Sequence, residues 1–342
     1  MPPFVIPLFI AHQGCPHRCI FCNQHVIAGG AGDRGGRITA GDVEKEIIKR
    51  LSWPRKHPES EVQVAFYGGS FTGLSQERQE ELLGAVQPFL NQGTVKVVRL
   101  STRPDYVNHE TPAFLQNRGV GIVELGVQSM DSAVLAKSLR GHTDDQVESA
   151  FDILKQAGLK VAGQLMIGLP GETTAGLLAG ARRLASLKPD FIRIYPTLVV
   201  RGSGLANFYK AGKYRPLSLN RAVALTAGLK RIFDRHGIRI VRMGLQPSSS
   251  LEENLLAGPY HPAFGELVLS RMMFKRTREI LSCIKGAKKK EISVSAADES
   301  IFRGQGKMNL NRLDSLGLMD GIRVLFDPEQ PRNTVRSVNC EG

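Results

Sequence analysis

The sequence predicts an α/β protein built from repeated strand and helix units. Short apolar segments of high β propensity alternate with amphipathic segments of helical length about six times before residue 245. Such alternation indicates a parallel sheet closed into a full or partial barrel, although a doubly wound open sheet would show the same rhythm. From about Gln246 the rhythm changes at Pro- and Ser-rich turns. We therefore expect a barrel over residues 1–245 and a small α/β extension over residues 246–342.

The expected strands are apolar runs rich in β-branched residues, at 5–10, 62–66, 95–100, 121–127, 159–166, 191–195 and 238–243. Helices are expected between them, at 39–51, 75–90, 111–117, 131–139, 143–157, 174–187 and 219–236. Two helix starts carry a capping-box pattern, Thr39 with Asp42 and Thr143 with Gln146. In the extension we expect a helix at 267–284, strands at 292–295 and 322–326, and a helix around Leu310.

Composition indicates an ordinary globular protein without a membrane partner. The 342 residues are 42% hydrophobic and 23% charged, and no apolar run reaches the about 18 residues of a membrane span. The first residues lack a basic leader and a cleavage site, so we expect a cytoplasmic protein. The five cysteines are too few and too unevenly placed for a disulfide framework. Cys283 and Cys340 stand alone, and two thiols cannot hold a second cubane cluster.

The charge balance favours a polyanionic partner. The chain has 45 Lys and Arg against 32 Asp and Glu, a net charge of +13, and nucleic acid is the first candidate. A basic amphipathic helix is expected at 267–284, with Arg271, Lys275 and Arg278 opposite Met273 and Ile280. Further lysines follow it at 285, 288, 289 and 290. A solvated outer face would show the same pattern, so both interpretations stay open.

Three cysteines in a CxxxCxxC arrangement directly follow the first expected strand. Thiolates such as those of Cys15, Cys19 and Cys22 select iron–sulfur clusters, zinc or copper(I). A closed four-iron cluster takes four cysteines, so three would leave one iron open, and an open position is typical of a metal that performs chemistry. The alternatives are buried structural thiols, or a zinc site completed by one of three nearby histidines, His12, His17 or His25.

The cysteine spacing, with Phe21 just before the last cysteine, resembles the radical S-adenosylmethionine (SAM) superfamily. That resemblance implies a (β/α)6 barrel with one open side. It also implies a [4Fe-4S] cluster on Cys15, Cys19 and Cys22 whose fourth iron chelates the methionine part of SAM. The glycine-rich stretch at residues 28–37 lacks the GK[ST] ending of a phosphate-binding loop, so we expect a mobile flap there.

Later motifs are similar to the oxygen-independent coproporphyrinogen oxidases and, more closely, to the radical SAM half of the elongator catalytic-subunit family. They are the segments Ser101–Tyr106, Glu124–Ser129, Arg140–His142 and Gln164–Gly171, while Tyr67–Ser70 is similar to the glycine-rich motif of the radical SAM superfamily as a whole. The resemblance implies that cofactor-binding residues lie within them, namely Gly68, Gly69, Ser70, Ser101, Gln128, Arg140 and Gln164, together with Phe21.

Individual roles follow from the same resemblance. Gly68 and Gly69 would let the backbone approach the SAM amino group, and Arg140 would bind the carboxylate through its planar fork. Gln164 would reach the ribose. Two positions depart from the pattern, because Ser101 stands where those families carry glutamate and Gln164 where the coproporphyrinogen oxidases carry aspartate.

The expected function is reductive cleavage of SAM to methionine and a 5′-deoxyadenosyl radical that abstracts a substrate hydrogen. A one-electron donor such as flavodoxin or ferredoxin would reduce the cluster, and the substrate would be a tRNA nucleoside, with wobble uridine as the first candidate. A radical reaction on a small molecule or a porphyrin-type substrate is the alternative enzyme. A zinc-bound RNA-binding protein without turnover is the alternative outside enzymes.

The region after the barrel adds two expectations. Tyr260 and His261 are candidates for quenching a radical or moving a proton, unless they serve only in lid packing. The 97 residues after position 245 are fewer than the about 150 of an ordinary catalytic domain, so elongator-type acetyl transfer is not expected.

Overall fold

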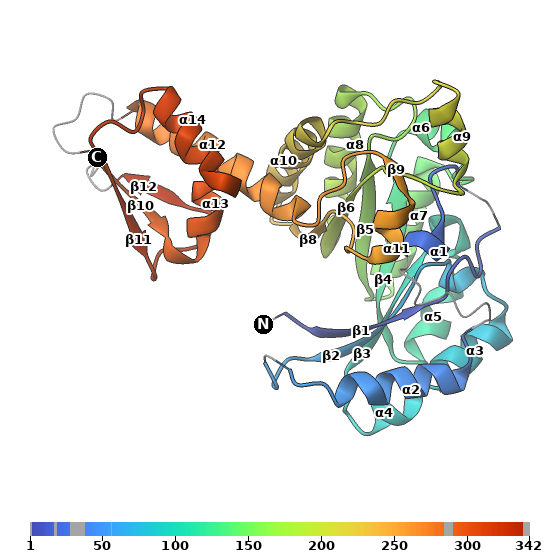
Figure 1. Cartoon of the computed structure of the whole chain (residues 1–342). Helices are drawn as coiled ribbons and strands as arrows, with labels where there is room; N and C mark the ends of the chain where they lie inside the picture. The colour runs from blue at the N-terminus through green and yellow to red at the C-terminus, as the bar shows by residue number, and fades with distance from the viewer. Residues whose placement is uncertain (1, 17–18, 28–37, 56, 284–289, 338–342) are drawn as a thin grey trace. The chain divides into compact units, whose positions relative to one another are not determined.

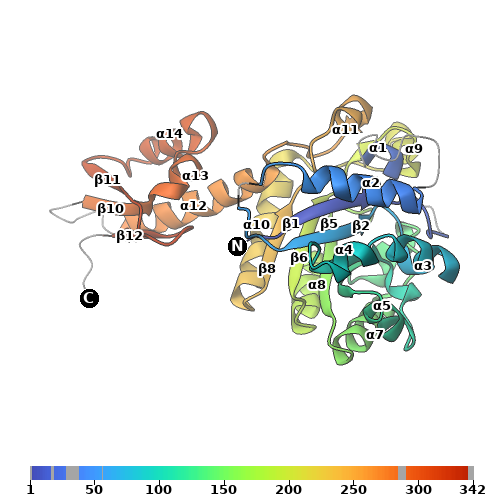
Figure 2. The ribbon, with the colours of Figure 1, turned by 90° about the horizontal axis from the view of Figure 1, so that it is seen from below.

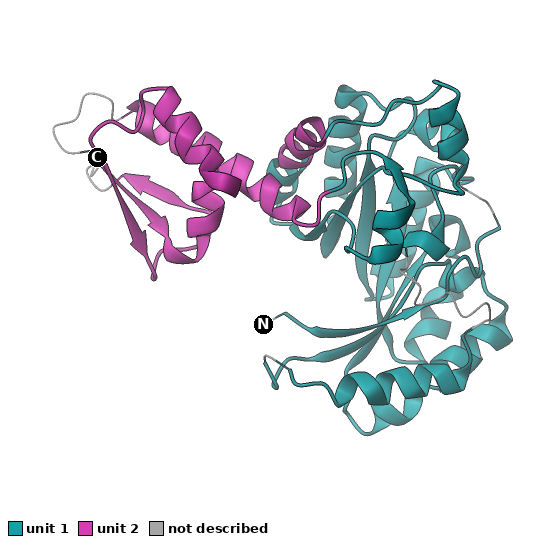
Figure 3. Ribbon diagram, in the orientation of Figure 1, with its two compact units in different colours: residues 1–218, 229–260 teal, residues 219–228, 261–342 magenta. Residues whose placement is uncertain are grey.

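The computed structural model describes residues 2–16, 19–27, 38–55, 57–283 and 290–337. The chain divides into two units (Figure 3). The first comprises Met1–Ser218 and Leu229–Tyr260, and the second comprises Leu219–Gly228 and His261–Gly342. No helix in the described part of the chain is long and apolar enough to cross a membrane.

The first unit is built on a curled seven-stranded parallel sheet. Its strands follow the order β1-β2-β3-β4-β5-β6-β8, with β1 and β8 at the two edges. Their bounds are β1 Phe4–Phe9, β2 Val62–Tyr67, β3 Val97–Thr102, β4 Val120–Gln128, β5 Lys160–Ile167, β6 Phe191–Pro196 and β8 Arg239–Met243. A doubly wound sheet reverses its strand order at a switch point, whereas this order follows the chain throughout. The partial barrel that the sequence predicts is therefore confirmed.

Helices lie along the outside of this sheet (Figures 1 and 2). They are α2 Ala40–Leu51, α3 Gln76–Gly84, α4 Gln87–Asn91, α5 Thr111–Gln116, α6 Ser132–Lys137, α7 Asp144–Gln156 and α8 Thr174–Ser186. The helix α10 Leu219–Arg235 is divided between the two units. Both predicted capping boxes are present, at Thr39 and at Thr143. The single helix expected at 75–90 is two helices, because Pro88 lacks a backbone N–H and fits only a first helical turn.

Shorter elements surround the carboxyl ends of the strands. They are α1 Gln24–Ile27, η1 Phe71–Gly73, η2 Pro104–Tyr106, β7 Val199–Val200, α9 Gly204–Lys210, α11 Ser249–Asn254 and β9 Leu255–Ala257. The first unit extends to Tyr260, beyond the boundary expected after residue 245. Two long-range contacts explain the difference: β9 pairs with β7, and Leu251 of α11 packs against Val26, Leu198 and Val200.

The second unit packs helices against a small sheet of order β11-β10-β12. Its elements are α12 Phe264–Cys283, β10 Lys290–Ser295, η3 Ala296–Asp298, α13 Glu299–Arg303, η4 Gln305–Lys307, α14 Met308–Ser315, β11 Ile322–Asp327 and β12 Val335–Ser337. The sequence did not predict β12. In α12 the expected apolar face is present, since Met273 is buried and Ile280 packs beside it, while Arg278 is exposed. The lysines expected at 285, 288 and 289, and Cys340, lie outside the described residues.

Buried Asn309 joins three helices of the second unit. Its Nδ2 lies 2.9 Å from Ser270 Oγ on α12 and 3.1 Å from the carbonyl oxygen of Ile301 on α13, while Asn309 itself belongs to α14. The carbonyl oxygens of Ser270 and Phe302 are also within hydrogen-bond distance, at 3.1 and 3.2 Å. Removing the amide would leave buried acceptors without a donor, which costs about 1–3 kcal/mol.

We therefore expect Asn309→Ala to loosen the second unit. Hydrogen–deuterium exchange of peptides from β10 and β11 should speed up about ten-fold or more, with unchanged exchange in the parallel sheet. The matched control is Asn311→Ala, which truncates an exposed residue of the same helix. Equal exchange rates in the two variants would contradict the structural role of Asn309.

Candidate functional site

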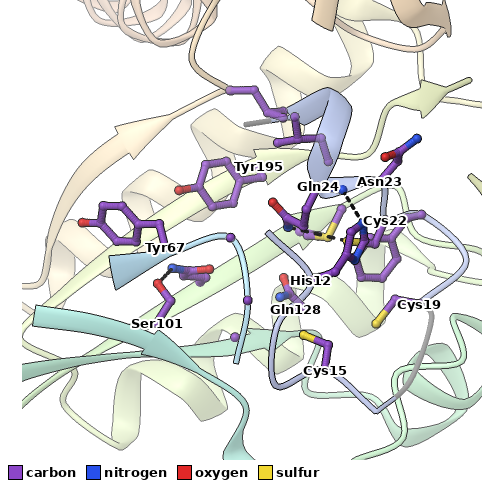
Figure 4. Close-up of a pocket in the computed structure, with 18 of the residues that line it drawn as sticks. His12, Cys15, Cys19, Cys22, Asn23, Gln24, Tyr67, Ser101, Gln128 and Tyr195 are labelled. Atoms are coloured by element: carbon purple, nitrogen blue, oxygen red, sulfur yellow. Dashed lines mark hydrogen bonds between the residues drawn. The ribbon is translucent and has the colours of Figure 1, made fainter. Parts of the chain in front are cut away.

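A pocket of about 1210 Å³ lies at the carboxyl ends of the parallel strands, and all the residues that line it belong to the first unit. Each of the seven strands contributes at least one of its last two residues, among them Phe9, Tyr67, Thr102, Gln128, Met166, Pro196 and Arg242. Active sites of barrels form at this end because the connecting loops converge there. Figure 4 shows part of the pocket wall.

Cys15, Cys19 and Cys22 all line this pocket (Figure 4). Strand β1 leads directly into their loop. His12 closes the loop, because its Nε2 accepts a hydrogen bond from the backbone N–H of Gln24 at 2.8 Å.

Apolar packing anchors the middle of the cysteine loop. Ile20 and Phe21 are buried in a cluster with Val134, Leu169 and Leu205. Phe21, which the resemblance gives as a cofactor residue, thus lines the pocket and also holds the loop in place.

The surroundings of the three cysteines are consistent with thiolates that bind a positively charged metal centre. Burial raises the pKa of Cys15, and it raises the pKa of Cys22 to about 12, so bare thiolates would be costly there. Arg140 Nη1 lies 3.4 Å from the sulfur of Cys19, and the charges of Arg140 and Arg103 oppose the effect of burial at Cys15. A bound iron cluster would favour the thiolate forms further, because metal ligation requires deprotonated sulfur.

The zinc alternative finds no assembled site in the described part of the chain. There, no three side chains of His, Cys, Asp or Glu converge closely enough to hold one metal ion. The rings of His12 and His25 lie 5.1 Å apart, with His12 bonded to Gln24. His17 and residues 28–37, where we expect a flap, lie outside the described residues.

The glycine segment after β2 meets the cysteine loop backbone to backbone. A Cβ atom on Gly69 would lie 2.4 Å from the carbonyl oxygen of Gln13, and one on Gly73 would lie 2.2 Å from that of Gly14. The Ser70 N–H donates to Gln13 O at 3.0 Å. These glycines are required because no side chain fits between the two segments.

The three residues that the resemblance places near the SAM amino group therefore differ in position. Gly68 and Gly69 line the pocket. Ser70 is fully buried beneath it, with its Oγ 3.0 Å from Thr102 Oγ1, and is not among the described lining residues.

A bulge at the end of β4 brings Gln128 and Arg140 to the pocket. The register of β4 shifts between Leu125 and Gln128, and Gln128 adopts a φ of 65°. Arg140 Nη2 donates to the carbonyl oxygen of Gly126 at 2.8 Å, in space that a Cβ on Gly126 would fill. Gln128 Oε1 is buried and has no hydrogen-bond partner among the described residues, so it can accept one from a ligand.

Ser101 and Gln164 line the pocket together. Gln164 Nε2 lies 3.1 Å from Ser101 Oγ and 3.2 Å from Glu124 Oε2. Glu124 is completely buried, and the sequence analysis did not single it out as a site residue. Its carboxylate thus lies behind the wall, at the Gln164 amide nitrogen that also contacts Ser101, the position for which the resemblance implies a glutamate.

Two arginines and a tyrosine surround Glu124. Arg99 Nε and Tyr67 Oη donate to it at 3.0 and 2.9 Å, and Arg193 Nε lies 2.7 Å from Oε2. Burial alone would raise the pKa of Glu124, but the charges of Arg193 and Arg99, together with hydrogen bonds from Tyr67 and Gln164, outweigh burial and lower it. Glu124 is therefore an anion shared between two cations. The sequence does contain a signal for this cluster, because a charged residue interrupts each of three apolar strand segments. These residues are Arg99, Glu124 and Arg193.

Tyr260 and His261 are not among the described residues that line the pocket. The Tyr260 hydroxyl donates to Glu252 Oε1 at 2.6 Å, and its ring packs on the cluster around Leu251. His261 Nδ1 accepts from the backbone of Ala263 at 3.0 Å. These contacts favour the lid-packing alternative over a role in proton or radical transfer.

The sequence profile of the radical SAM superfamily matches residues 9–179, and that of the radical SAM C-terminal domain matches residues 189–273. An uncharacterised protein of Methanocaldococcus jannaschii is 30% identical over 230 residues, which cover 65% of this chain and 69% of that protein.

The chain is also similar to a second curated protein and to a solved structure. The tRNA uridine(34) acetyltransferase of M. jannaschii is 26% identical over 270 residues, covering 68% of this chain and 49% of the enzyme. The chain thus spans about half the length of that relative. The solved structure of Methanocaldococcus infernus Elp3 with an N-terminal deletion superposes with a TM-score of 0.62 and 22% identity, covering 80% of this chain and 64% of that one.

We expect each of the variants Cys15→Ala, Cys19→Ala and Cys22→Ala to lose most of the bound iron and acid-labile sulfide. Two remaining thiolates hold a four-iron cluster poorly. The measurement is iron and sulfide content after anaerobic reconstitution. Cys283→Ala removes an exposed thiol at the end of α12 and should retain the wild-type content. Full iron content in Cys19→Ala would refute the ligand assignment.

Gly69→Ala should also lower the iron content, although it removes no ligand. The added methyl group must displace the backbone of Gln13 or Ile10 and so shift the cysteine loop. The control is Gly84→Ala at the end of α3, where an added Cβ meets no atom within 4 Å. We expect iron loss in Gly69→Ala alone, and equal iron content in both variants would show that the backbone contact does not position the ligands.

Proposed function

Because the chain belongs to the radical SAM superfamily, we propose that it is an enzyme that uses a [4Fe-4S] cluster and SAM to abstract a hydrogen atom from a tRNA nucleoside. Its clearest support is the position of Cys15, Cys19 and Cys22 in one pocket at the carboxyl ends of the strands. Wobble uridine is the first candidate substrate, and a flavodoxin or ferredoxin would donate the electron.

The cluster, when bound, supplies the electron for reductive cleavage of SAM. Cys15, Cys19 and Cys22 would hold it. Arg140 would bind the SAM carboxylate, because a guanidinium fork matches two carboxylate oxygens and its partners in the described chain are the Cys19 sulfur and the Gly126 carbonyl oxygen. Gln128 Oε1, which lacks a described partner, would accept a hydrogen bond from the SAM amino group or a ribose hydroxyl.

Two further side chains would orient SAM and protect the reaction. The Gln164 amide nitrogen donates hydrogen bonds to Ser101 Oγ and Glu124 Oε2, which fix the side chain. Its carbonyl oxygen is then left to accept a hydrogen bond from a ribose hydroxyl. Phe21 and Met166 form apolar wall near the cysteines and would limit access of water to a reactive centre.

A tRNA substrate is supported by charge and by the relatives. The net charge of +13 favours a polyanion, and the described pocket wall contains arginines but neither Asp nor Glu. The relative that acts on tRNA uridine 34 shares 26% of its residues with this chain over 270 positions. The chain spans about half of that enzyme, and the proposal is limited to radical chemistry on tRNA.

The test is mass spectrometry of nucleosides from total tRNA of a deletion strain and its parent. We expect one modified nucleoside to be missing or truncated in the deletion strain. A gene encoding Cys283→Ala should restore it, and one encoding Cys19→Ala should not. Identical profiles under aerobic and anaerobic growth would contradict the tRNA proposal and favour a small-molecule or porphyrin-type substrate.

A further inference from the structure

Arg193 and Arg242 lie side by side on neighbouring strands of the pocket wall. The parallel pairing of β6 with β8 sets them directly in register. Residues paired in this way project from the same face of a sheet. Both side chains line the pocket, where Arg193 is 13% exposed and Arg242 is half-buried.

The charge of this arginine pair is only partly balanced. Glu124 pairs with Arg193, but it also pairs with Arg99. Arg242 donates to two neutral acceptors, the carbonyl oxygen of Gly244 at 3.3 Å and Oε1 of Gln246. Within the described chain no carboxylate forms an ion pair with Arg242, and burial together with the Arg193 charge lowers its pKa. Adjacent like charges at a partly buried position cost free energy unless an anion joins them.

The rest of the pocket wall supplies no such anion. Of the described residues that line it, none is Asp or Glu, and five are arginines, namely Arg50, Arg103, Arg140, Arg193 and Arg242. Arg103 is paired with Asp105 and Arg50 with Glu46. No described residue of the wall thus completes the pair at Arg193 and Arg242, and an anionic ligand would do so.

Two tyrosine hydroxyls lie beside the arginine pair. Arg193 Nη2 donates to Tyr67 Oη at 3.0 Å. Burial raises the pKa of Tyr195, and the nearby charge of Arg193 acts against this rise. Figure 4 shows the hydroxyl ends of Tyr67 and Tyr195 pointing the same way, on the side of the pocket away from Cys15 and Cys19. The Tyr67 hydroxyl already donates its proton to Glu124, so the donors left for a ligand are the guanidinium groups and the Tyr195 hydroxyl. These donors are suited to the oxygens of a phosphate or carboxylate.

The pocket has room for a second molecule beside SAM. Its volume of about 1210 Å³ exceeds the range of about 300–1,000 Å³ that is usual for one ligand. At the other end Arg140 lies 3.4 Å from the Cys19 sulfur, so it serves the cofactor. The arginine pair is thus left for the molecule that is modified.

We propose that Arg193 and Arg242 form a subsite for an oxyanion of the substrate, and that this oxyanion is a phosphate of the RNA. The assignment of Arg140 to SAM and the choice of RNA rest on the proposed function. A phosphate or carboxylate of a small substrate would offer the same oxygens to the same donors, so the experiment separates the two sources.

The test compares three variants for binding of a synthetic anticodon stem–loop RNA at several salt concentrations. Arg242→Gln should weaken binding about ten-fold or more and reduce the slope of log affinity against log salt by about one, since one phosphate contact is lost. Arg242→Lys keeps the charge and should recover part of the affinity. Arg239→Gln is the matched control, because Arg239 lies on the same strand but is exposed and does not line the pocket.

A second titration uses inorganic phosphate and calorimetry at low ionic strength on the same reconstituted proteins. If phosphate binds the wild type and Arg239→Gln but not Arg242→Gln, while RNA binds all three equally, the oxyanion subsite stands and the RNA source is wrong. If RNA binds with equal affinity and salt slope and phosphate does not distinguish the variants, the subsite is refuted while tRNA modification survives. Equal iron content in all variants confirms that the cluster site is intact.

Discussion

The candidate site depends on the backbone contact between the cysteine loop and the glycine segment after β2. Gly14, Gly69 and Gly73 let the two segments approach so closely that a Cβ on any of them would fall within 2.4 Å of a carbonyl oxygen. The loop leaves β1 and the glycine segment leaves β2, and these strands are paired in the sheet. The order of the strands therefore fixes where the three sulfurs lie, and apolar packing of Ile20 and Phe21 holds the loop against the barrel.

Positive charge is the second constraint on this pocket. Some arginines of the wall form an ion pair with a carboxylate of the described chain, and others do not. We assign a structural role to the paired arginines and a ligand-binding role to those without such a carboxylate. Arg103 is neutralised by Asp105, and Arg193 shares Glu124 with Arg99. Arg140 and Arg242 have only neutral or sulfur partners among the described residues. Two guanidinium groups without a described carboxylate partner in one pocket suit two oxyanion groups, which in our proposal are the SAM carboxylate near the cysteines and an oxyanion of the substrate.

Local signals in the sequence predicted local features well. The capping boxes at Thr39 and Thr143, the strand and helix alternation and the cysteine spacing depend on residues close together in the chain. Features made by distant residues were missed. The unit boundary depends on pairing of β9 with β7, and the adjacency of Arg193 and Arg242 depends on the register of β6 and β8. The resemblance implies Ser70 as a cofactor-binding residue, and the contact of its Oγ with Thr102 could not be read from the sequence.

The central claim is that this pocket holds a cluster and SAM in a reactive arrangement. The most direct measurement is chromatography of the products formed when reconstituted protein is reduced anaerobically in the presence of SAM. We expect the wild-type protein to release 5′-deoxyadenosine and methionine, and Cys19→Ala to release neither. Wild-type protein with a full complement of iron that leaves SAM intact, with and without added tRNA, would contradict the account.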